Sequence, residues 1–368
     1  MTTVVAAGPV ASAPPAVSRI LAIDTARGLA VLGMIIVHVG VTRDLAWGDP
    51  GSWTALAHGR SSILFATLAG VSIAMLSGRM RPPAGQGLVT ARLRILVRAV
   101  LLFAIGGLLT ALGTGISVIL QTYALLFVCC LPFLRWSPQR LLMLAAGWAV
   151  VAPPLTVWLS HLLPDSCGVA AEGCSGAQVT DLAAVGDYPG LVWITFALTG
   201  LAIGRCDLGS RVVRLRMLAA GAPLMVIGYG GAWLAGRLGG PAMSEWDVLR
   251  SAEPHSGTSF EIAGSLGFVL TVLAVLLLVA DRLRPLLFPI AAVGSIPLTA
   301  YAAHIVAVWI IDDGADSATG NSMLLIFLTV TVAAATVWVL VLGRGPLERL
   351  VTWVSMCATR TENRKALW

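Results

Sequence analysis

Ten long apolar segments, separated by short polar stretches, follow one another through this 368-residue sequence. About 20 apolar residues cross a bilayer as a helix, and every segment reaches or approaches that length. Only 11% of the residues are charged, against about 25% in soluble domains, which is too little to cover a water-facing surface. A soluble enzyme, a disordered protein and a disulfide scaffold are therefore excluded. The sequence predicts an all-α, polytopic integral membrane protein with helices at about 24–41, 61–78, 93–113, 116–134, 140–160, 188–205, 211–236, 259–280, 286–311 and 322–343.

The basic residues predict which ends of these helices face the cytoplasm. With the N-terminus in the cytoplasm and the loops assigned alternately, all but four of the 24 Lys and Arg residues fall inside. The four outside are Arg43, Arg60, Arg237 and Arg250. A missed or extra helix would move every later loop to the other side. The asymmetry therefore predicts ten helices with both termini in the cytoplasm.

The chain divides into three parts on this interpretation. Residues 1–18 are rich in Ala, Pro, Val and Ser and are predicted to be a disordered tail, with no signal peptide apparent. Residues 19–343 form one transmembrane bundle, and residues 344–368 form a basic cytoplasmic tail. In the longest outer loop, Cys167 and Cys174 are either a disulfide or two free thiols.

The five histidines all fall in the outer half of the membrane or in the outer loops. A histidine titrates near neutral pH and acts as a base, an acid or a nucleophile. The alternative is that each one is an interfacial side chain bonded to a neighbour, which we favour for the isolated His161. Counted along a straight helix from Leu286, the last of them lies about 27 Å into the ninth segment. The five are His38, His58, His161, His255 and His304.

Asp24 and Arg27 lie three residues apart at the start of the first helix and therefore share a face. One interpretation is an N-terminal cap beside a positive-inside anchor. The other is a cytoplasmic anion site, in which Arg27 holds a phosphate and Asp24 orients the guanidinium.

His58 and Arg60 stand just before the second helix, where an outer Arg opposes the positive-inside bias and so needs a partner. We expect His58, with His38 as the second choice, to act as the general base on the acceptor or as a transient acyl carrier. Arg60 or Tyr301 is expected to stabilise the oxyanion. Ser61, the residue after Arg60, is either a helix cap or a substrate contact.

Two further helices carry polar residues at the same depth. His255 precedes a possible capping box formed by Thr258 and Glu261, and we expect His255 and Glu261 to contact substrate. Tyr301 and His304 share a helical face within about two turns after Pro297, a residue that kinks helices. We count this pair among the catalytic candidates. No residue spacing predicts a metal site.

These elements resemble known membrane acyltransferases. Asp24-x-x-Arg27-Gly28 leading into an apolar span resembles the first helix of proteins related to heparan-α-glucosaminide N-acetyltransferase. The His-Gly-Arg-Ser-Ser element at 58–62, which leads into Leu-Ala-Gly-Val-Ser at 68–72, is similar to the second helix of the bacterial branch. Thr-Ala-Tyr-x-x-His at 299–304 and Gly-Arg-Gly-Pro-Leu-Glu at 343–348 resemble YeiB-type membrane proteins of the same superfamily.

The resemblance implies transfer of an acyl group, acetyl above all, from cytoplasmic acyl-CoA to an acceptor on the far side. In the family an essential histidine precedes a tryptophan of the first outer loop. Here His58 follows Trp53, so the resemblance does not assign the catalytic histidine.

We therefore expect an acyl-CoA-dependent O- or N-acyltransferase in the inner membrane of a bacterium. Its expected partners are the lipid bilayer, acyl-CoA with Asp24 and Arg27 at the cofactor site, and an extracytoplasmic sugar or lipid-linked glycan. The chain could also form a homodimer, and nothing in the sequence indicates that it binds nucleic acid. The alternative is a transporter or efflux protein that uses the same His, Arg and Glu residues for substrate or protons, although the sequence shows no inverted repeat. A non-catalytic membrane scaffold is the third possibility.

Overall fold

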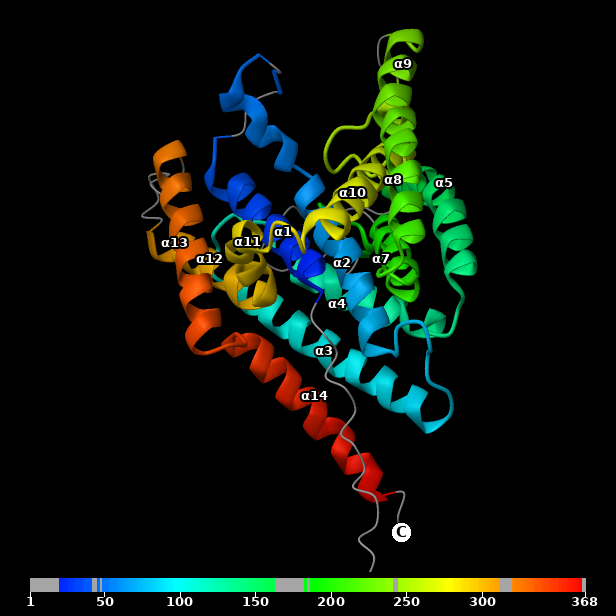
Figure 1. Ribbon diagram of the computed structural model, residues 1–368. Coiled ribbons are helices and arrows are strands. Elements are labelled where there is room, and N and C mark those ends of the chain that lie inside the picture. Colours follow the sequence, from blue (N-terminus) through cyan, green and yellow to red (C-terminus); the bar gives the residue numbers. More distant parts are fainter. Residues whose placement is uncertain are drawn as a thin grey trace, which may run out of the picture.

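The computed structural model describes residues 20–41, 45–46, 48–162, 182–183, 186–240, 244–311 and 320–365, and the regular elements of these ranges are all helices (Figure 1). The predicted tail at 1–18 and the pair Cys167 and Cys174 lie outside the described residues. The α-helices are α1 Leu21–Val39, α2 Arg60–Leu76, α3 Gln86–Thr110, α4 Leu120–Cys129, α5 Pro138–Leu162, α7 Gly190–Arg205, α8 Arg211–Met225, α9 Gly231–Leu238, α10 Ser259–Val279, α11 Arg284–Ser295, α12 Pro297–Ile311, α13 Asn321–Val341 and α14 Pro346–Lys365. Short helices of other types are η1 Pro50–Ala57, η2 Leu131–Phe133, the π-helix η4 Val226–Gly230 and η5 Glu245–Arg250.

Each of the ten predicted segments is helical in the structure, and the all-helical membrane fold is confirmed. Within the described ranges, seven helical stretches are long and apolar enough to cross a membrane, or eight if α11 and α12 count as one bent span. Helix α4, with 10 residues, and helix α7, with 16, are apolar but short. The count of ten spans and the orientation of the termini stay predictions.

The predicted ninth segment, 286–311, is not one continuous helix, and the kink expected at Pro297 is a complete break. It breaks at Ile296 into α11 and α12, which meet at 75°. Pro297 has no backbone N–H to continue the α11 hydrogen-bond ladder, so a new helix starts there. Glu348 of α14 caps that new N-terminus, because its Oε1 accepts from the N–H of Leu298 at 2.8 Å and of Thr299 at 3.1 Å. His304 is consequently seven residues into α12 and not 27 Å along one helix.

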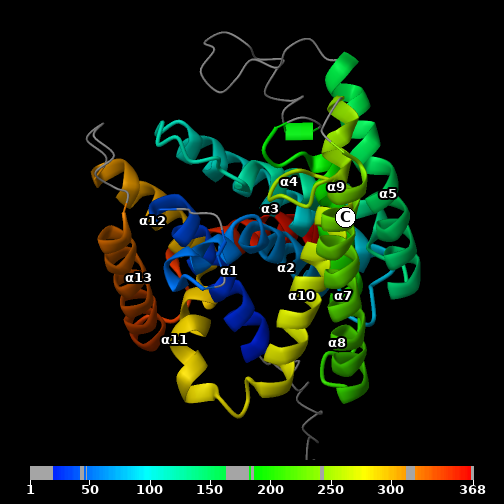
Figure 2. The same ribbon diagram turned by 90° about the horizontal axis from the view of Figure 1, so that it is seen from above.

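Helix α1 is central to the bundle and contacts α2, α10, α11, α12 and α13 (Figure 2). Its contact with α11 is close because both helices carry glycine there. A Cβ on Gly28 would lie 2.0 Å from the Ile290 carbonyl oxygen, and one on Gly294 would lie 1.7 Å from that of Asp24. Residue 28 faces residue 290 and residue 24 faces residue 294, so α11 runs antiparallel to the first half of α1.

Three helix ends meet at one buried side chain. The Arg205 guanidinium, at the end of α7, donates to the carbonyls of Ser77 and Arg79, which follow α2, and to that of Leu134, which follows η2. The C-terminal ends of α2, η2 and α7 therefore lie together. Beyond them, the segment after residue 344 is helical as α14 and runs beside α3 (Figure 1), where Arg94 Nε donates to Thr359 Oγ1 at 3.3 Å.

Candidate functional site

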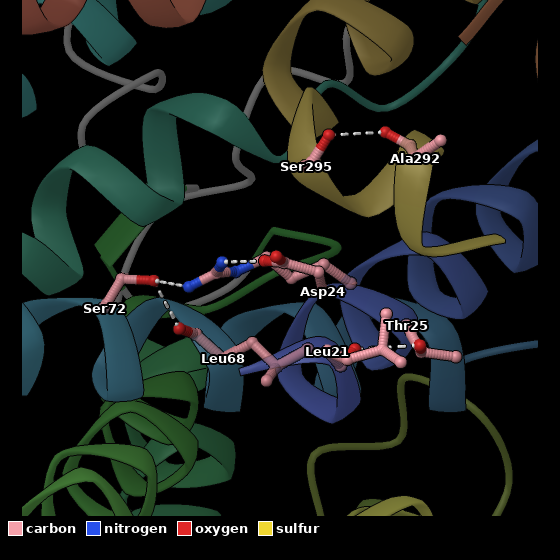
Figure 3. Close-up of polar contacts among 8 residues, drawn as sticks. Leu21, Asp24, Thr25, Leu68, Ser72, Ala292 and Ser295 are labelled. Carbon is pink, nitrogen blue, oxygen red and sulfur yellow. Dashed lines mark hydrogen bonds and ion pairs between the residues drawn. The ribbon is translucent and has the colours of Figure 1, made fainter. Parts of the chain in front are cut away.

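At the beginning of α1, Asp24 and Arg27 form a short polar chain with α2. Arg27 Nη1 donates to the Asp24 carboxylate at 3.0 Å, and Arg27 Nη2 donates to Ser72 Oγ at 2.8 Å (Figure 3). The Ser72 hydroxyl in turn donates to the Leu68 carbonyl. The side chains of Asp24 and Arg27 are only 13% and 19% exposed. The predicted shared face is present, and the pair is held against α2.

A cavity of about 400 Å³ adjoins Asp24, between the start of α1, the end of α10 and helices α8 and α11. Ser295 lies across from Asp24 in the same region (Figure 3). The charged residues of the lining are Asp24, Arg214, Asp281 and Arg284. Neither basic residue of the lining was singled out by the sequence analysis, although both belong to loops expected in the cytoplasm.

Toward the other end of α1, His38 meets His304 of α12. The Nδ1 atom of His38 and the Nε2 atom of His304 are 2.9 Å apart, and the two rings stack with their centroids 5.2 Å apart. His304 is buried, with 3% of its surface exposed, whereas His38 is half-buried. One ring nitrogen must donate its proton to the other, so the hydrogen bond fixes both rings.

Tyr301 completes this group, which we call the α1–α12 cluster. Its ring packs edge-on against His304 at 5.0 Å and against His38 at 6.5 Å. The Tyr301 hydroxyl and the His304 Nδ1 are buried and make no hydrogen bond of good geometry with the described residues. Buried polar atoms without partners are rare, and each needs an explanation.

His58 and His255 form a second pair at the start of α2 and α10. Their rings meet edge-on with centroids 5.8 Å apart, and Tyr188 packs on His255 at 5.2 Å. No ring contact among the described residues joins this pair to the α1–α12 cluster. Four of the five histidines therefore form two pairs, each joining residues far apart in the sequence.

Glu261 orders the loop that carries His255. Its carboxylate accepts from the N–H of His255 and of Gly257, both at 2.7 Å, and both of these residues have positive φ. The Thr258 hydroxyl caps α10 by accepting from the Glu261 N–H at 3.0 Å, which confirms half of the capping box. The other half is wrong, because the Glu261 side chain bonds the turn at residues 255–257 and not the Thr258 N–H. Glu261 thereby fixes the position of His255.

The partner of Arg60 is Tyr229, which the sequence analysis missed. Arg60 Nε donates to the Tyr229 hydroxyl at 2.9 Å, and the guanidinium lies 4.8 Å from the centre of the Tyr229 ring. Tyr229 belongs to the π-helix η4, and such helices often mark functional sites. The Glu261 carboxylate is also close to this position, since a Cβ on Gly59, the residue before Arg60, would lie 3.7 Å from its Oε1.

The remaining predicted residues, Ser61 and His161, pack against neighbouring elements. Ser61 is buried where α2 crosses α1, and a Cβ on Gly33 would lie 2.0 Å from its hydroxyl oxygen. His161, at the end of α5, has Trp246 at 6.1 Å between ring centroids. Within the described ranges, no group of His, Cys, Asp and Glu is arranged to hold a metal ion.

Burial gives His255 a pH-dependent effect on stability. Desolvation lowers its pKa below 6.5 and His58 lowers it further, while the backbone hydrogen bond and the charge of Asp187 oppose the shift. As the pH falls below 6.5, His255 becomes protonated in the unfolded chain but stays neutral in the folded protein, so the free energy of unfolding decreases. We expect a thermal-unfolding series from pH 8 to pH 5 to show this loss. His255→Asn, which tolerates positive φ and does not titrate, should have a shallower slope; an equal slope would contradict the assignment.

Taken together, the fold and these polar groups define a multi-pass helical membrane protein with paired histidines inside its bundle. Residues 19–232, more than half of the chain, match the family model described as heparan-alpha-glucosaminide N-acetyltransferase, catalytic. The chain belongs to this family, which indicates a membrane acetyltransferase-like function. No curated protein sequence matches it. The matched region holds Asp24, Arg27, His38, His58 and Arg60, whereas His255 and His304, the partners of His58 and His38, lie beyond it.

Proposed function

We propose that the protein transfers an acyl group, acetyl in the simplest case, from acyl-CoA to a hydroxyl or amine on the opposite side of the membrane. The chain belongs to a family of acetyltransferases, and the observation that carries this proposal is what lies at the two ends of α1. Its first turns border a cavity with charged walls, and its last turn holds a hydrogen-bonded histidine pair. Arg27 and His38 are 11 residues apart, about 16 Å along the helix. With the basic ends in the cytoplasm of a bacterium, the donor would be bound inside.

The cavity beside Asp24 is the proposed donor site. Arg214 and Arg284 offer guanidinium groups for the phosphates of CoA, since Arg binds phosphate with a fork of donors. Asp24 belongs to the lining, whereas Arg27 acts through it, because Arg27 donates to the Asp24 carboxylate and is itself ordered by Ser72. The acidic groups of the same lining, Asp24 and Asp281, would face the adenosine amine and hydroxyls, and not the phosphates.

The α1–α12 cluster is the proposed reaction centre, which ranks His38 ahead of His58. If His38 Nδ1 donates to His304 Nε2, the Nε2 of His38 keeps a lone pair and acts as the general base. It takes the proton of the acceptor hydroxyl or amine, whose oxygen or nitrogen then bonds to the thioester carbonyl carbon. The C–S bond breaks, and the CoA thiolate takes that proton from His38. Tyr301 is the candidate donor to the oxyanion.

His58, His255 and Arg60 form the second polar group, to which we assign the acceptor. Arg60, held by Tyr229, and the turn ordered by Glu261 give that group fixed hydrogen-bonding directions. These residues suit the hydroxyls or an anionic group of a sugar. His58 serves here as a binding residue.

Binding of acetyl-CoA to purified protein in nanodiscs tests the proposal. We expect saturable binding in the wild type, a loss of about tenfold or more in Arg284→Ala and Arg214→Ala, and a smaller loss in Arg27→Ala, which acts through Asp24. Arg216→Ala is the matched control, because Arg216 is exposed on the same helix as Arg214 and does not line the cavity. His58→Ala should bind normally. If no acyl-CoA of any chain length binds the wild type, the acyltransferase is refuted, and ion-driven uptake into proteoliposomes would then favour the transporter.

A further inference from the structure

A second cavity, of about 450 Å³, lies between α12 and α13, and His304 is part of its wall. Its lining extends from Ile296, the residue before α12, to Ile311 at the end of α12, and from Ile326 to Trp338 along α13. On the α12 side it is bordered by small residues, whose short side chains leave space beside the buried His304. Those residues are Ala300, Ala303 and Ala307. A volume of about 300–1,000 Å³ is typical of pockets that bind small ligands.

The lining of this α12–α13 cleft is almost entirely apolar. Besides His304, its polar side chains are Thr299, Thr331 and Trp338. Two of these are already engaged, since Thr299 Oγ1 donates to Glu348 at 2.6 Å and Trp338 Nε1 donates to the Arg344 carbonyl at 3.3 Å. A ligand with amide groups would lose its hydrogen bonds to water here and find few replacements. The cleft therefore favours a hydrocarbon chain over the pantetheine arm of CoA.

The cleft opens toward lipid and not toward the donor cavity. On α13 its residues Ile326 and Val330 are 55% and 59% exposed, on a helix long and apolar enough to span a membrane. The donor cavity has no lining residue in common with it, although the two adjoin at Ser295 and Ile296. A hydrocarbon chain from the bilayer would therefore enter this cleft from the side and lie against His304, whereas the other cavity is the proposed CoA site.

We propose that the α12–α13 cleft binds the hydrocarbon tail of a lipid-linked acceptor and presents its head group to the α1–α12 cluster. This inference rests on the proposed acyl transfer and narrows its acceptor from any sugar to one carried on a lipid. His304 contributes twice: its Nε2 orients His38, and its buried Nδ1, without a good partner among the described residues, lies at the cleft that the acceptor occupies. As in the proposed transfer, the acceptor oxygen or nitrogen bonds to the thioester carbonyl carbon and the C–S bond breaks.

Photolabelling measures occupation of the cleft without any enzymatic activity. The probe is a diazirine-bearing polyprenyl phosphate in phosphatidylcholine nanodiscs, with labelled residues mapped by mass spectrometry. We expect labels on α12 and α13 that unlabelled polyprenyl phosphate displaces. Ala303→Phe and Ala307→Phe, which fill the cleft, should reduce labelling about tenfold. Ala333→Phe is the matched control, because Ala333 is exposed on α13 outside the lining.

Three outcomes would overturn the cleft assignment. Labels spread evenly over all lipid-facing helices would mean ordinary boundary lipid, and displacement by palmitoyl-CoA alone would mean the donor chain. Cross-links between two copies of the protein at residue 303 would mean a dimer contact.

Activity then separates this inference from the proposed function. Ala303→Phe should lose transfer to a polyprenyl-linked sugar about tenfold while retaining acetyl-CoA binding. If the wild type does not bind acetyl-CoA, the proposed acyl transfer is refuted, even if α12 and α13 are still specifically photolabelled. Normal acetyl-CoA binding with unlabelled α12 and α13 refutes only the lipid-linked acceptor.

Discussion

Replacing His38 by alanine is expected to lower the rate of acyl transfer by about 10²–10⁴-fold while acetyl-CoA binding stays unchanged. The Nε2 of His38 is the proposed base, and a positioned base contributes a factor of that size. Arg27 and the donor cavity lie at the opposite end of α1, so the loss should fall on kcat and not on the affinity for CoA. Initial rates with acetyl-CoA and acceptor, alongside equilibrium binding, measure both quantities.

The same geometry predicts how His304 acts. It is a positioning residue, because its Nε2 accepts the proton that keeps His38 in the active tautomer. His304→Gln places an amide oxygen near that point and should retain most of the activity, whereas His304→Ala should resemble His38→Ala. His38→Asn separates the two roles, since its amide can still donate to His304 but has no basic nitrogen. Equal activity in His304→Ala and the wild type would refute the assignment.

Hydropathy predicted the helical segments because crossing a bilayer requires about 20 apolar residues whatever the tertiary structure. It did not predict the break at Ile296. Pro297 indicated a kink, but its size depends on contacts from elsewhere, namely Gly294 against Asp24 and Glu348 at the new N-terminus. Helix α4 shows the same limit, because a span of 19 residues was expected where the helix has 10.

The candidate site was only partly predictable for a related reason. The histidines and Arg60 were identified as individual candidates, because burying a polar or charged side chain in a membrane is costly. Their pairing depends on which helices touch, and His38 lies 266 residues from His304. Tyr229 drew no attention because a tyrosine in an apolar run is ordinary. Its contact with Arg60 follows from the π-helix, for which the sequence Val226–Gly230 gives no clear signal.

Arg205 has a structural role that its sequence position does not indicate. By sequence it is one of several basic residues in a loop expected in the cytoplasm. In the structure its guanidinium is buried, with the residue 5% exposed, and it donates to the Ser77 carbonyl at 2.9 Å and to the Ser77 hydroxyl at 2.8 Å. It also donates to the carbonyls of Arg79 and Leu134. One side chain thus satisfies carbonyls that helix ends leave without partners.

Arg205→Met is therefore expected to destabilise the folded protein by at least about 3 kcal/mol, since each carbonyl left buried and unpaired costs about 1–3 kcal/mol. Arg205→Lys should recover only part of this loss, because an ammonium group cannot reach carbonyls of separate helices as a planar fork does. Arg211→Met is the matched control, as Arg211 is exposed at the start of α8. Unfolding in a mild detergent, followed by circular dichroism, gives the comparison. If Arg205→Met and Arg211→Met unfold alike, the ends of α2, η2 and α7 are held together by apolar contacts alone, and Arg205 has no structural role.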